Sequence, residues 1–445
     1  MLVIALFTAA LSAQTAPATT AAAPAKAAAA APTHLMSDEL NQELPKWLRF
    51  NGEIRTRFEG LGGLGFKPDS SDAFLLTRLR LNMKVSPTSW MRFQFQAQDA
   101  QAMWRNAKPD APPYEDTFDL RQGYVEFGNP DKPGFALRVG RQELFFGEQR
   151  LVGHLNWTNT ARSFDAARLT MKYGKVKVDA FASAVVNLKD GTYNKSSGGN
   201  DLHGAYVSID QWLPKATIEP YAFWRLGRGT KTEAGAPGLL DRKVYGGRIV
   251  GKLPAHLDYG AEMVGQGGSV GTDSINAWAG HWVLAYTLPK VKKATRLVAE
   301  YNYASGDKSP LDGKQETFDQ LYPTGHDKLG LSDQVGWRNI EDLRSGVEFK
   351  ATKKLSMNAF YHSWWLASTK DALYNAAGAV LVSKDPTGNS GRFVGQEADI
   401  QATYALRPEF SLGGGYANVF PGTFLKNKTP GKAYRFSYVM ATYSF

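Results

Sequence analysis

The sequence predicts an all-β protein, a transmembrane antiparallel β-barrel of about 18 strands. From residue 47 to the end, segment after segment alternates apolar and polar side chains, which is typical of strands with two different environments. The connections between these segments alternate between short and long. The chain ends on an aromatic residue in YVMATYSF, as outer-membrane strands commonly do. Together these three observations favour a barrel over a soluble sandwich.

Composition narrows the alternatives. The chain has 445 residues, no cysteine and a formal net charge of +10. It has no apolar run of 18 residues, which excludes a bundle of transmembrane helices but not a barrel, whose strands alternate. The positive charge suits an acidic partner such as nucleic acid, a polyanion or anionic lipid. The lack of cysteine permits an oxidising compartment and excludes a lipoprotein anchor.

The N-terminal segment is predicted to lie outside the barrel. Residues 1–13 are apolar and end in small residues, as in a secretory signal peptide; a buried helix is the alternative. Residues 14–46 are rich in Ala and Pro and are expected to form a periplasmic tether. Residues 37–44 are expected to form one short helix. The barrel domain is expected to span residues 47–445.

The predicted strands have about 10 to 14 residues each, enough for a tilted strand to cross a bilayer. They are residues 47–60, 74–86, 89–101, 117–128, 135–144, 163–173, 175–187, 201–211, 216–227, 241–253, 256–266, 275–288, 294–306, 339–350, 354–367, 393–406, 408–419 and 433–445.

Short and long connections sort by strand parity. Turns after even-numbered strands are mostly brief, as at residues 86–88 and 174–175. Connections after odd-numbered strands are long and rich in Gly and Asp, and the longest, residues 307–338, has about thirty residues and is expected to fold over or into the pore. Short periplasmic turns and long external loops are what outer-membrane barrels show. An even strand count also places both termini in the periplasm.

The two faces of each strand are predicted from the same alternation. Leu79 and Leu81 share a face that should contact lipid, whereas Arg78 and Arg80 should line the lumen. The predicted aromatic girdles comprise Trp90, Trp212, Trp224, Trp278, Trp282, Trp364 and Tyr443. In the last strand, Tyr434, Phe436 and Tyr438 fall on the lumen face, which is atypical and leaves its register open.

Two segments resemble the alginate-export family of outer-membrane barrels. They are VGRQELFFGEQRLVGHLNWTNTARSFDAARL at residues 139–169 and ETFDQLYPTGHDKLGLSDQVGWRNIEDLRSGVEFK at residues 316–350. The resemblance extends over residues 47–445 and implies an anion-selective channel for a polyuronate with an arginine-rich constriction. The motif residues of these loops are Trp157, Asn159, Asp165, Asp319, His326, Asp327, Trp337 and Arg338.

The predicted path for a substrate is a set of inward arginines accompanied by acids. A guanidinium group pairs with a carboxylate through two parallel hydrogen bonds and stays charged at any working pH. The alternative for each residue is a salt bridge that holds the wall together. The set comprises Arg55, Arg57, Arg78, Arg80, Arg92, Arg121, Arg138, Arg168, Arg225, Arg248, Arg296 and Arg344, with Glu300, Glu397 and Asp399 among the acids.

No enzyme or cofactor motif is found. The sequence lacks HExxH, a P-loop and GxSxG, so no catalytic residue, metal ligand or cofactor is predicted. The aspartates of residues 307–338 are expected to be solvated rather than to bind calcium, because no EF-hand-like spacing occurs. A serine beside His281 or His362, as in an outer-membrane lipase, stays open as an alternative.

The expected function is a passive channel in the outer membrane of a Gram-negative-type cell, carrying an anionic polysaccharide or its oligomers. The alternatives are a porin for small sugar acids or other anions, and a barrel that serves as scaffold for an enzyme or adhesin. The expected partners are outer-membrane lipid, the acidic saccharide and the assembly machinery, with no nucleic acid, and the barrel is expected to be monomeric.

Overall fold

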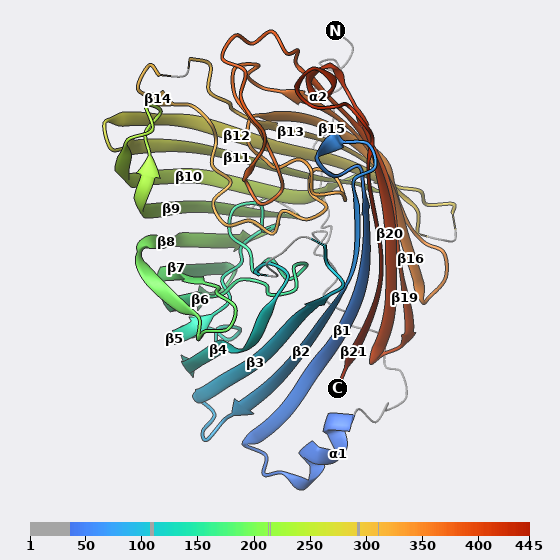
Figure 1. The fold of residues 1–445 in the computed structure, drawn as a ribbon. Helices are drawn as coiled ribbons and strands as arrows, with labels where there is room; N and C mark the ends of the chain where they lie inside the picture. Colours follow the sequence, from blue (N-terminus) through green and yellow to red (C-terminus); the bar gives the residue numbers. More distant parts are fainter. Residues whose placement is uncertain (1–35, 107–110, 212, 214, 292–293, 310) are drawn as a thin grey trace.

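The computed structural model describes residues 36–106, 111–211, 213, 215–291, 294–309 and 311–445. Within these residues, 18 antiparallel strands close into one barrel, which confirms the predicted fold class (Figure 1). The barrel strands are β1 (Leu48–Gly62), β2 (Ser71–Val85), β3 (Met91–Met103), β4 (Asp116–Gly128), β5 (Gly134–Gln142), β6 (Phe164–Tyr173), β7 (Val176–Asn187), β8 (Lys195–Asp210), β9 (Ala216–Lys231), β10 (Pro237–Leu253), β11 (Leu257–Val270), β12 (Asp273–Thr287), β13 (Arg296–Ala304), β15 (Ile340–Lys350), β16 (Leu355–Leu366), β19 (Phe393–Arg407), β20 (Phe410–Pro421) and β21 (Tyr434–Ser444).

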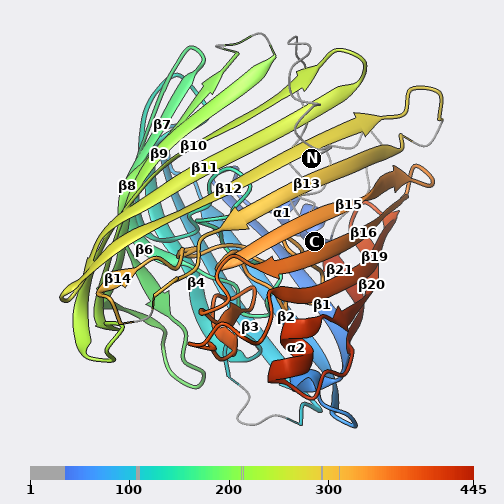
Figure 2. The ribbon, with the colours of Figure 1, turned by 90° about the horizontal axis from the view of Figure 1, so that it is seen from above.

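The barrel closes between its first and last strands. β1 and β21 pair antiparallel from Glu53 opposite Ser444 to Gly62 opposite Arg435. All other paired strands of the barrel are consecutive barrel strands in the chain, so the chain runs up and down around the ring. The strands run diagonally in Figure 2, as expected for a closed barrel, in which strands tilt against the axis.

The connections confirm the predicted sorting for the longest segments, while the segments 232–236 after β9 and 271–272 after β11 are short, and the segment 288–295 after β12 is longer than the other turns at its end of the barrel. The long segments 143–163, 305–339 and 367–392 follow β5, β13 and β16, whereas β6 and β7 are joined by the turn 174–175. The connection after β11 was predicted to be long but consists of residues 271–272 only. The reason is that β11 and β12 continue pairing to Val270 opposite Asp273, beyond the predicted ends.

Short helices and strands lie in the connections at both ends of the barrel. The helix α1 (Met36–Glu43) lies at the end that holds the C-terminus and confirms the predicted short helix (Figure 1). The helix α2 (Thr423–Lys428) lies at the opposite end, with the strands β14 (Lys314–Gln315), β17 (Leu373–Tyr374) and β18 (Val380–Val382) and the 3-10 turn η2 (Leu64–Phe66) in other loops. Neither α-helix of the described residues has the length and apolarity to cross a membrane. The predicted signal peptide lies outside the described residues, as does most of the tether.

The strands turn their polar side inward. Leu79 and Leu81 are exposed on the outer surface, whereas Arg78 and Arg80 between and beside them are buried. Trp90, Trp224 and Trp278 are exposed as predicted for the girdle. Trp364 is fully buried instead, because it shares the inward parity of His362 on β16 and packs against the backbone of Gly330. Trp212 lies outside the described residues.

A hydrophobic core fills part of the lumen. It joins the inward aromatics of β7–β9 to the long loops 143–163 and 305–339. Tyr434, Phe436 and Tyr438 belong to this core and are 5–6% exposed. Their inward orientation, atypical for a water-filled lumen, follows because the loops cover them, and Val439 on the other face is 65% exposed.

Candidate functional site

Two long loops pair with each other inside the barrel. In Figure 1 the teal segment that follows β5 lies within the ring of strands. Val152 forms a parallel bridge with Tyr322, and the backbone N–H groups of Gly153 and Tyr322 donate to Tyr322 O and Leu151 O at 2.9 and 2.8 Å. Arg162 Nη1 donates to both Gly153 O and Pro323 O. The loops 143–163 and 305–339 therefore act as one insert in the lumen, as predicted for the longer of them.

Trp157 is stacked between side chains of the wall and of the second loop. Its ring lies 3.7 Å from the ring of His326, with 2° between the planes. The guanidinium carbon of Arg57 lies 3.8 Å from the same ring, within the range of a cation–π interaction. Tyr438 of β21 meets it edge-on at 4.9 Å. His326 Nδ1 also lies 2.9 Å from Asp333 Oδ2. Trp157 thus ties the loop 143–163 to β1, β21 and the loop 305–339.

Four arginines of β1 and β2 converge on the apex of the loop 143–163. Arg55 donates to the carbonyls of residues 156, 157 and 158, and Arg57 donates to Trp157 O at 2.6 Å. Arg78 donates to two of the same carbonyls, at 3.1 Å each. Arg80 Nη1 lies 2.6 Å from Asn156 Oδ1. We call Arg55, Arg57, Arg78, Arg80 and the residues 156–158 that they hold the apex site.

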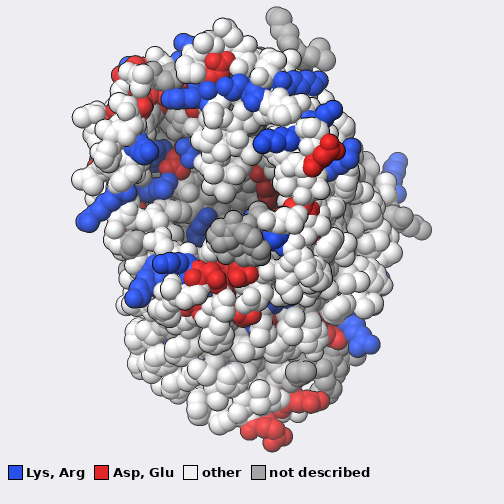
Figure 3. Space-filling view, viewed as in Figure 1, with Lys and Arg blue, Asp and Glu red and all other residues white. Residues whose placement is uncertain are grey.

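Most other inward arginines lie in ion pairs. Arg296 bridges Asp258 and Glu348, while Arg344 and Arg150 share Glu300. The remaining pairs are Arg92 and Arg138 with Glu126, Arg121 with Glu143, Arg168 with Asp179, Arg225 and Arg242 with Asp319, and Arg248 with Glu148 and Glu219. The lumen therefore contains a network of positively and negatively charged side chains. Figure 3 shows charged side chains of both signs around the hollow at the centre of the view.

The register places arginine directly opposite arginine at three points of the wall. Arg55 faces Arg78, Arg138 faces Arg168, and Arg225 faces Arg242. Like charges directly opposite each other on neighbouring strands are destabilising. Each pair has an acidic neighbour, Glu53 at Arg78, Glu126 and Asp179 at Arg138 and Arg168, and Asp319 at Arg225 and Arg242, which offsets part of this repulsion.

Asp319 of the loop 305–339 is the shared counter-ion of one such pair. It contacts Arg225 and lies 3.6 Å from Arg242 Nε. Burial alone would raise the pKa of Asp319, but Arg225, Arg242 and Arg338 hold it well below the usual range. Asp319 therefore stays ionised and fastens the loop to β9 and β10.

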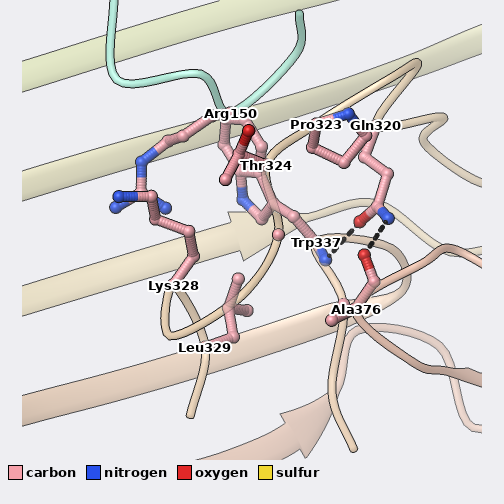
Figure 4. A pocket seen from close by; sticks show the side chains of 10 residues that line it. Arg150, Gln320, Pro323, Thr324, Lys328, Leu329, Trp337 and Ala376 are labelled. Carbon is pink, nitrogen blue, oxygen red and sulfur yellow. Dashed lines mark hydrogen bonds between the residues drawn. The ribbon is translucent and has the colours of Figure 1, made fainter. Parts of the chain in front are cut away.

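A small pocket opens between the loops, with about 10 Å³ available to the centre of a water-sized sphere, room for about one water molecule. Gln320 holds its wall by accepting from the backbone N–H of Trp337 and donating to Ala376 O, both at 2.8 Å (Figure 4). Arg150 and Lys328 line it as cations. Its size is below that of ordinary ligand pockets, so it does not account for the passage of a polymer.

The remaining motif residues fasten the loops. Asn159 donates to carbonyls of β2, β3 and the segment 104–115, and Asp165 accepts from Arg141. Trp337 Nε1 donates to Tyr303 O at 3.0 Å, and Arg338 donates to Gly378 O. Asp327 is half-buried on the loop 305–339.

The buried histidines pair with polar groups other than hydroxyls. His362 Nδ1 lies 3.0 Å from Asp342 Oδ1, and His281 Nδ1 lies 2.8 Å from Asn302 Oδ1. Among the described residues, no serine hydroxyl is bonded to either ring, and no three His, Cys, Asp or Glu side chains gather in a metal-binding arrangement. The lipase alternative therefore has no support from these contacts.

Several residues of the site were not singled out from the sequence. Arg242 shares the inward parity of Val244 and Arg248 on β10, so the strand period was a sufficient signal for it. Arg150 and Arg162 lie on a loop, where no period operates. Glu397 and Asp399 do face inward on β19 as predicted, and Glu397 accepts from Ser332 of the loop 305–339.

The fold is similar to known outer-membrane porins. The crystal structure of Pseudomonas aeruginosa OpdQ matches with a TM-score of 0.62 and 12% identity, covering 91% of this chain and 99% of that chain. OccK3 (OpdO) of the same organism matches with a TM-score of 0.59 and 13% identity over 91% and 97%. Acinetobacter baumannii OccAB2 matches with a TM-score of 0.59 and 10% identity over 89% and 98%.

The sequence itself identifies the family. No curated protein sequence matches the chain significantly. The sequence profile described as Alginate export matches residues 46–438, which is most of the chain and includes both loops of the insert. The chain therefore belongs to the alginate export family.

Proposed function

We propose that this barrel is an outer-membrane channel that passes an anionic polysaccharide or its oligomers, of the alginate-like polyuronate class, through its arginine-rich lumen. The family and the porin fold support a channel. The observation that carries the substrate class is the occurrence of arginine opposite arginine at three points of the inner wall. A chain with one carboxylate per sugar would meet these groups in succession, and bidentate guanidinium–carboxylate pairs favour such a ligand.

Rapid passage also requires release. Acids lie beside most of the lumen arginines, as Asp179 beside Arg168 and Glu126 beside Arg138. Each acid competes with the substrate for its arginine, so that no single position holds the polymer tightly. The acids therefore support transport rather than storage.

A second candidate is a porin for small sugar acids or other anions. It is favoured by the insert, because the loops 143–163 and 305–339 occupy part of the lumen. A narrowed lumen suits a small solute better than a polymer chain. The two candidates share the anion preference and differ in the size of the solute that blocks or permeates the channel.

The proposed setting is the outer membrane of a Gram-negative-type cell. Residues 1–13 would act as a signal peptide and residues 14–46 as a periplasmic tether, leaving residues 47–445 as the barrel domain. The exposed apolar band that includes Leu79, Leu81 and Leu297 would contact lipid. The outer-membrane assembly machinery would insert the chain, which we propose to be a monomeric barrel.

The test is ion selectivity of the purified protein in a planar bilayer. Arg80→Glu and Arg138→Glu reverse two inward charges where screening is weak, so the reversal potential under a salt gradient should lose or invert its anion preference. Lys at either position should keep the preference but weaken current block by a mannuronate oligomer, since Lys lacks the bidentate fork. Lys384→Glu, on an exposed external loop, is the matched control for charge outside the lumen.

Comparison of blockers separates the two candidates. Block by mannuronate oligomers that strengthens with chain length supports the polymer channel, whereas equal or stronger effects of monomeric uronate or phosphate support the small-anion porin. An unchanged reversal potential in variants that still fold would refute both. Arg168→Glu, whose side chain is 15% exposed, repeats the reversal at a position that is less buried than Arg80.

A further inference from the structure

Two arginines of the apex site are buried with no carboxylate bound to them. Arg55 is 5% exposed and donates to the carbonyl oxygens of residues 156–158, at 2.9–3.1 Å. Arg80 is 6% exposed and donates only to two amide oxygens, Gln98 Oε1 and Asn156 Oδ1. Among the described residues, Arg80 Nη2 has no hydrogen-bond partner.

The nearby carboxylates are already engaged. Glu53 pairs with Arg78, Glu59 pairs with Arg57, and Glu143 pairs with Arg121. Within the described residues, Arg55 and Arg80 therefore remain as positive charges in a buried place, with neutral oxygens as their acceptors. A buried charge that lacks a counter-ion is strongly unfavourable unless a ligand supplies one.

A carboxylate is a better acceptor for these groups than the loop. Hydrogen bonds from a guanidinium to an ionised oxygen are shorter and stronger than those to a neutral carbonyl, and a carboxylate accepts two in parallel. The loop apex presents one oxygen per residue along residues 156–158, so it occupies the donors without neutralising them. The carboxylate of a uronate would both occupy the guanidinium donors and neutralise their charge.

The apex is also bounded by strained backbone. Leu155 has φ +52° and Ala161 has φ +58°, a region that residues other than glycine seldom adopt. Asn159 anchors the loop just beyond the apex by donating to three carbonyls at 2.9–3.1 Å. The segment 155–158 is thus a short arch between a strained residue and a fixed one.

We propose that the loop apex is an internal ligand: residues 156–158 fill an anion-binding site on β1 and β2, and a passing carboxylate chain displaces them. The site takes the carboxylate of a uronic acid residue, bound by Arg55 and Arg80. The resting channel is then narrowed by its own loop and widens in proportion to bound substrate. This inference rests on the proposed function, since it takes the proposed substrate as the displacing group.

The absence of cysteine allows a single reporter thiol. Leu155 is half-buried and directly precedes the apex residues 156–158 without being one of the ligands, so Leu155→Cys reports on the position of the arch. The rate of modification by a small neutral thiol reagent should rise several-fold with a mannuronate oligomer at a concentration that blocks the current. A neutral mannose oligomer of equal length should leave the rate unchanged. Ser309→Cys, on an exposed external loop, is the control thiol and should not respond.

Two results would overturn the inference. Current block by the mannuronate oligomer with an unchanged or slower rate at position 155 would mean that the apex stays in place while the proposed function survives. If the oligomer neither blocks the current nor changes the modification rate, the inference and the proposed function are both contradicted.

A second variant tests the site from the loop side. Asn156→Ala removes the side-chain acceptor of Arg80 and leaves the wall intact, so thiol modification at position 155 should be faster even without oligomer. An unchanged basal rate in Leu155→Cys/Asn156→Ala would contradict the internal-ligand role.

Discussion

At the scale of single residues, the insert depends on a few polar side chains with far-reaching partners. Asn159 Nδ2 lies 2.9–3.1 Å from the carbonyl oxygens of Thr77, Gln101 and Tyr114. The side chain joins β2, β3 and the segment 104–115 to the loop 143–163. Because Asn159 is 1% exposed, water cannot replace it as a donor.

Asn159→Ala should therefore loosen the insert. Leaving buried carbonyls without a donor costs about 1–3 kcal/mol each, so the loss of three such contacts should lower the free energy of unfolding by at least about 3 kcal/mol. Denaturant unfolding followed by tryptophan fluorescence measures this. Asn389→Ala, at an exposed position of the loop 367–392, should change it by less than about 0.5 kcal/mol. Equal stability of the two variants would show that Asn159 is not an anchor.

The inward orientation of single arginines was predictable, but their partners were not. Strand parity was enough to place Arg78 and Arg80 on the lumen side. The stacking of Arg57 on the ring of Trp157 could not be predicted from the sequence. The two residues lie 100 positions apart, and the conformation of a loop leaves no repeating pattern in the sequence. The alternative of wall salt bridges holds by geometry for Arg296, whereas Arg55 has loop carbonyls instead.

At the scale of elements, the long loops 305–339 and 367–392 share a titratable contact. Asp307 lies at the start of the loop 305–339, and its backbone N–H donates to Asp371 of the loop 367–392. Burial, a hydrogen bond with Glu233 and the charges of Glu233 and Asp371 raise the pKa of Asp307 to about 7. A protonated Asp307 can share a hydrogen bond with Glu233, while an ionised one repels both acids.

Rising pH should loosen these loops. Because the pKa of Asp307 in the folded state lies above its unfolded value, its contribution to stability is complete at acidic pH and is lost as pH rises through about 7. External protease should therefore cut the loops 305–339 and 367–392 faster at about pH 9 than at about pH 5, after correction for protease activity on a denatured substrate. Asp307→Asn should abolish most of that difference. A pH response that persists in this variant would assign the effect to another group.

The strands were more predictable than the loops for a physical reason. A membrane strand has lipid on one side and the lumen on the other, so burial alternates with a period of two along β13 and along β2 up to Arg80. Trp364 was assigned to the girdle because it is a tryptophan, although its position on the strand pointed to the lumen. Inside the barrel it is buried by the insert. The length of the loop 305–339 predicted that it folds into the pore, but not that it would pair with the loop 143–163.

At the scale of the whole molecule, the last residue extends the seam at which β21 closes the barrel against β1. Gly52 of β1 and Phe445 exchange two backbone hydrogen bonds, at 2.7 and 3.0 Å, and Gly52 leaves the space that the ring of Phe445 occupies. Deleting Phe445 removes both bonds, worth about 1 kcal/mol each, and the terminal aromatic. The heat-modifiable, folded fraction should fall and assembly should slow, while Phe445→Tyr should assemble normally. Normal assembly of the deletion would show that this seam tolerates an open end.

Orientation can be tested in intact cells. A protease site inserted at Gly388, in the exposed turn of the loop 367–392, should be cut by added protease. The same insertion at Pro408, in the tight connection between β19 and β20, should stay protected until the outer membrane is opened. The opposite pattern would invert the barrel in the membrane.

Because the first and last strands are neighbours, the same barrel could be formed by a chain that begins at a different strand. α1 and the C-terminus lie at the same end of the barrel, and within the described residues each barrel strand pairs with its two neighbours around the ring. A circular permutant that links residue 445 to residue 47 and opens within the exposed turn 385–391 keeps every strand pair while moving both ends to the outside. The closing seam would then be formed by β16 and β19, and the pair of β1 and β21 would become a covalent hairpin. The shape of the barrel should therefore not depend on the connection at which the chain is opened.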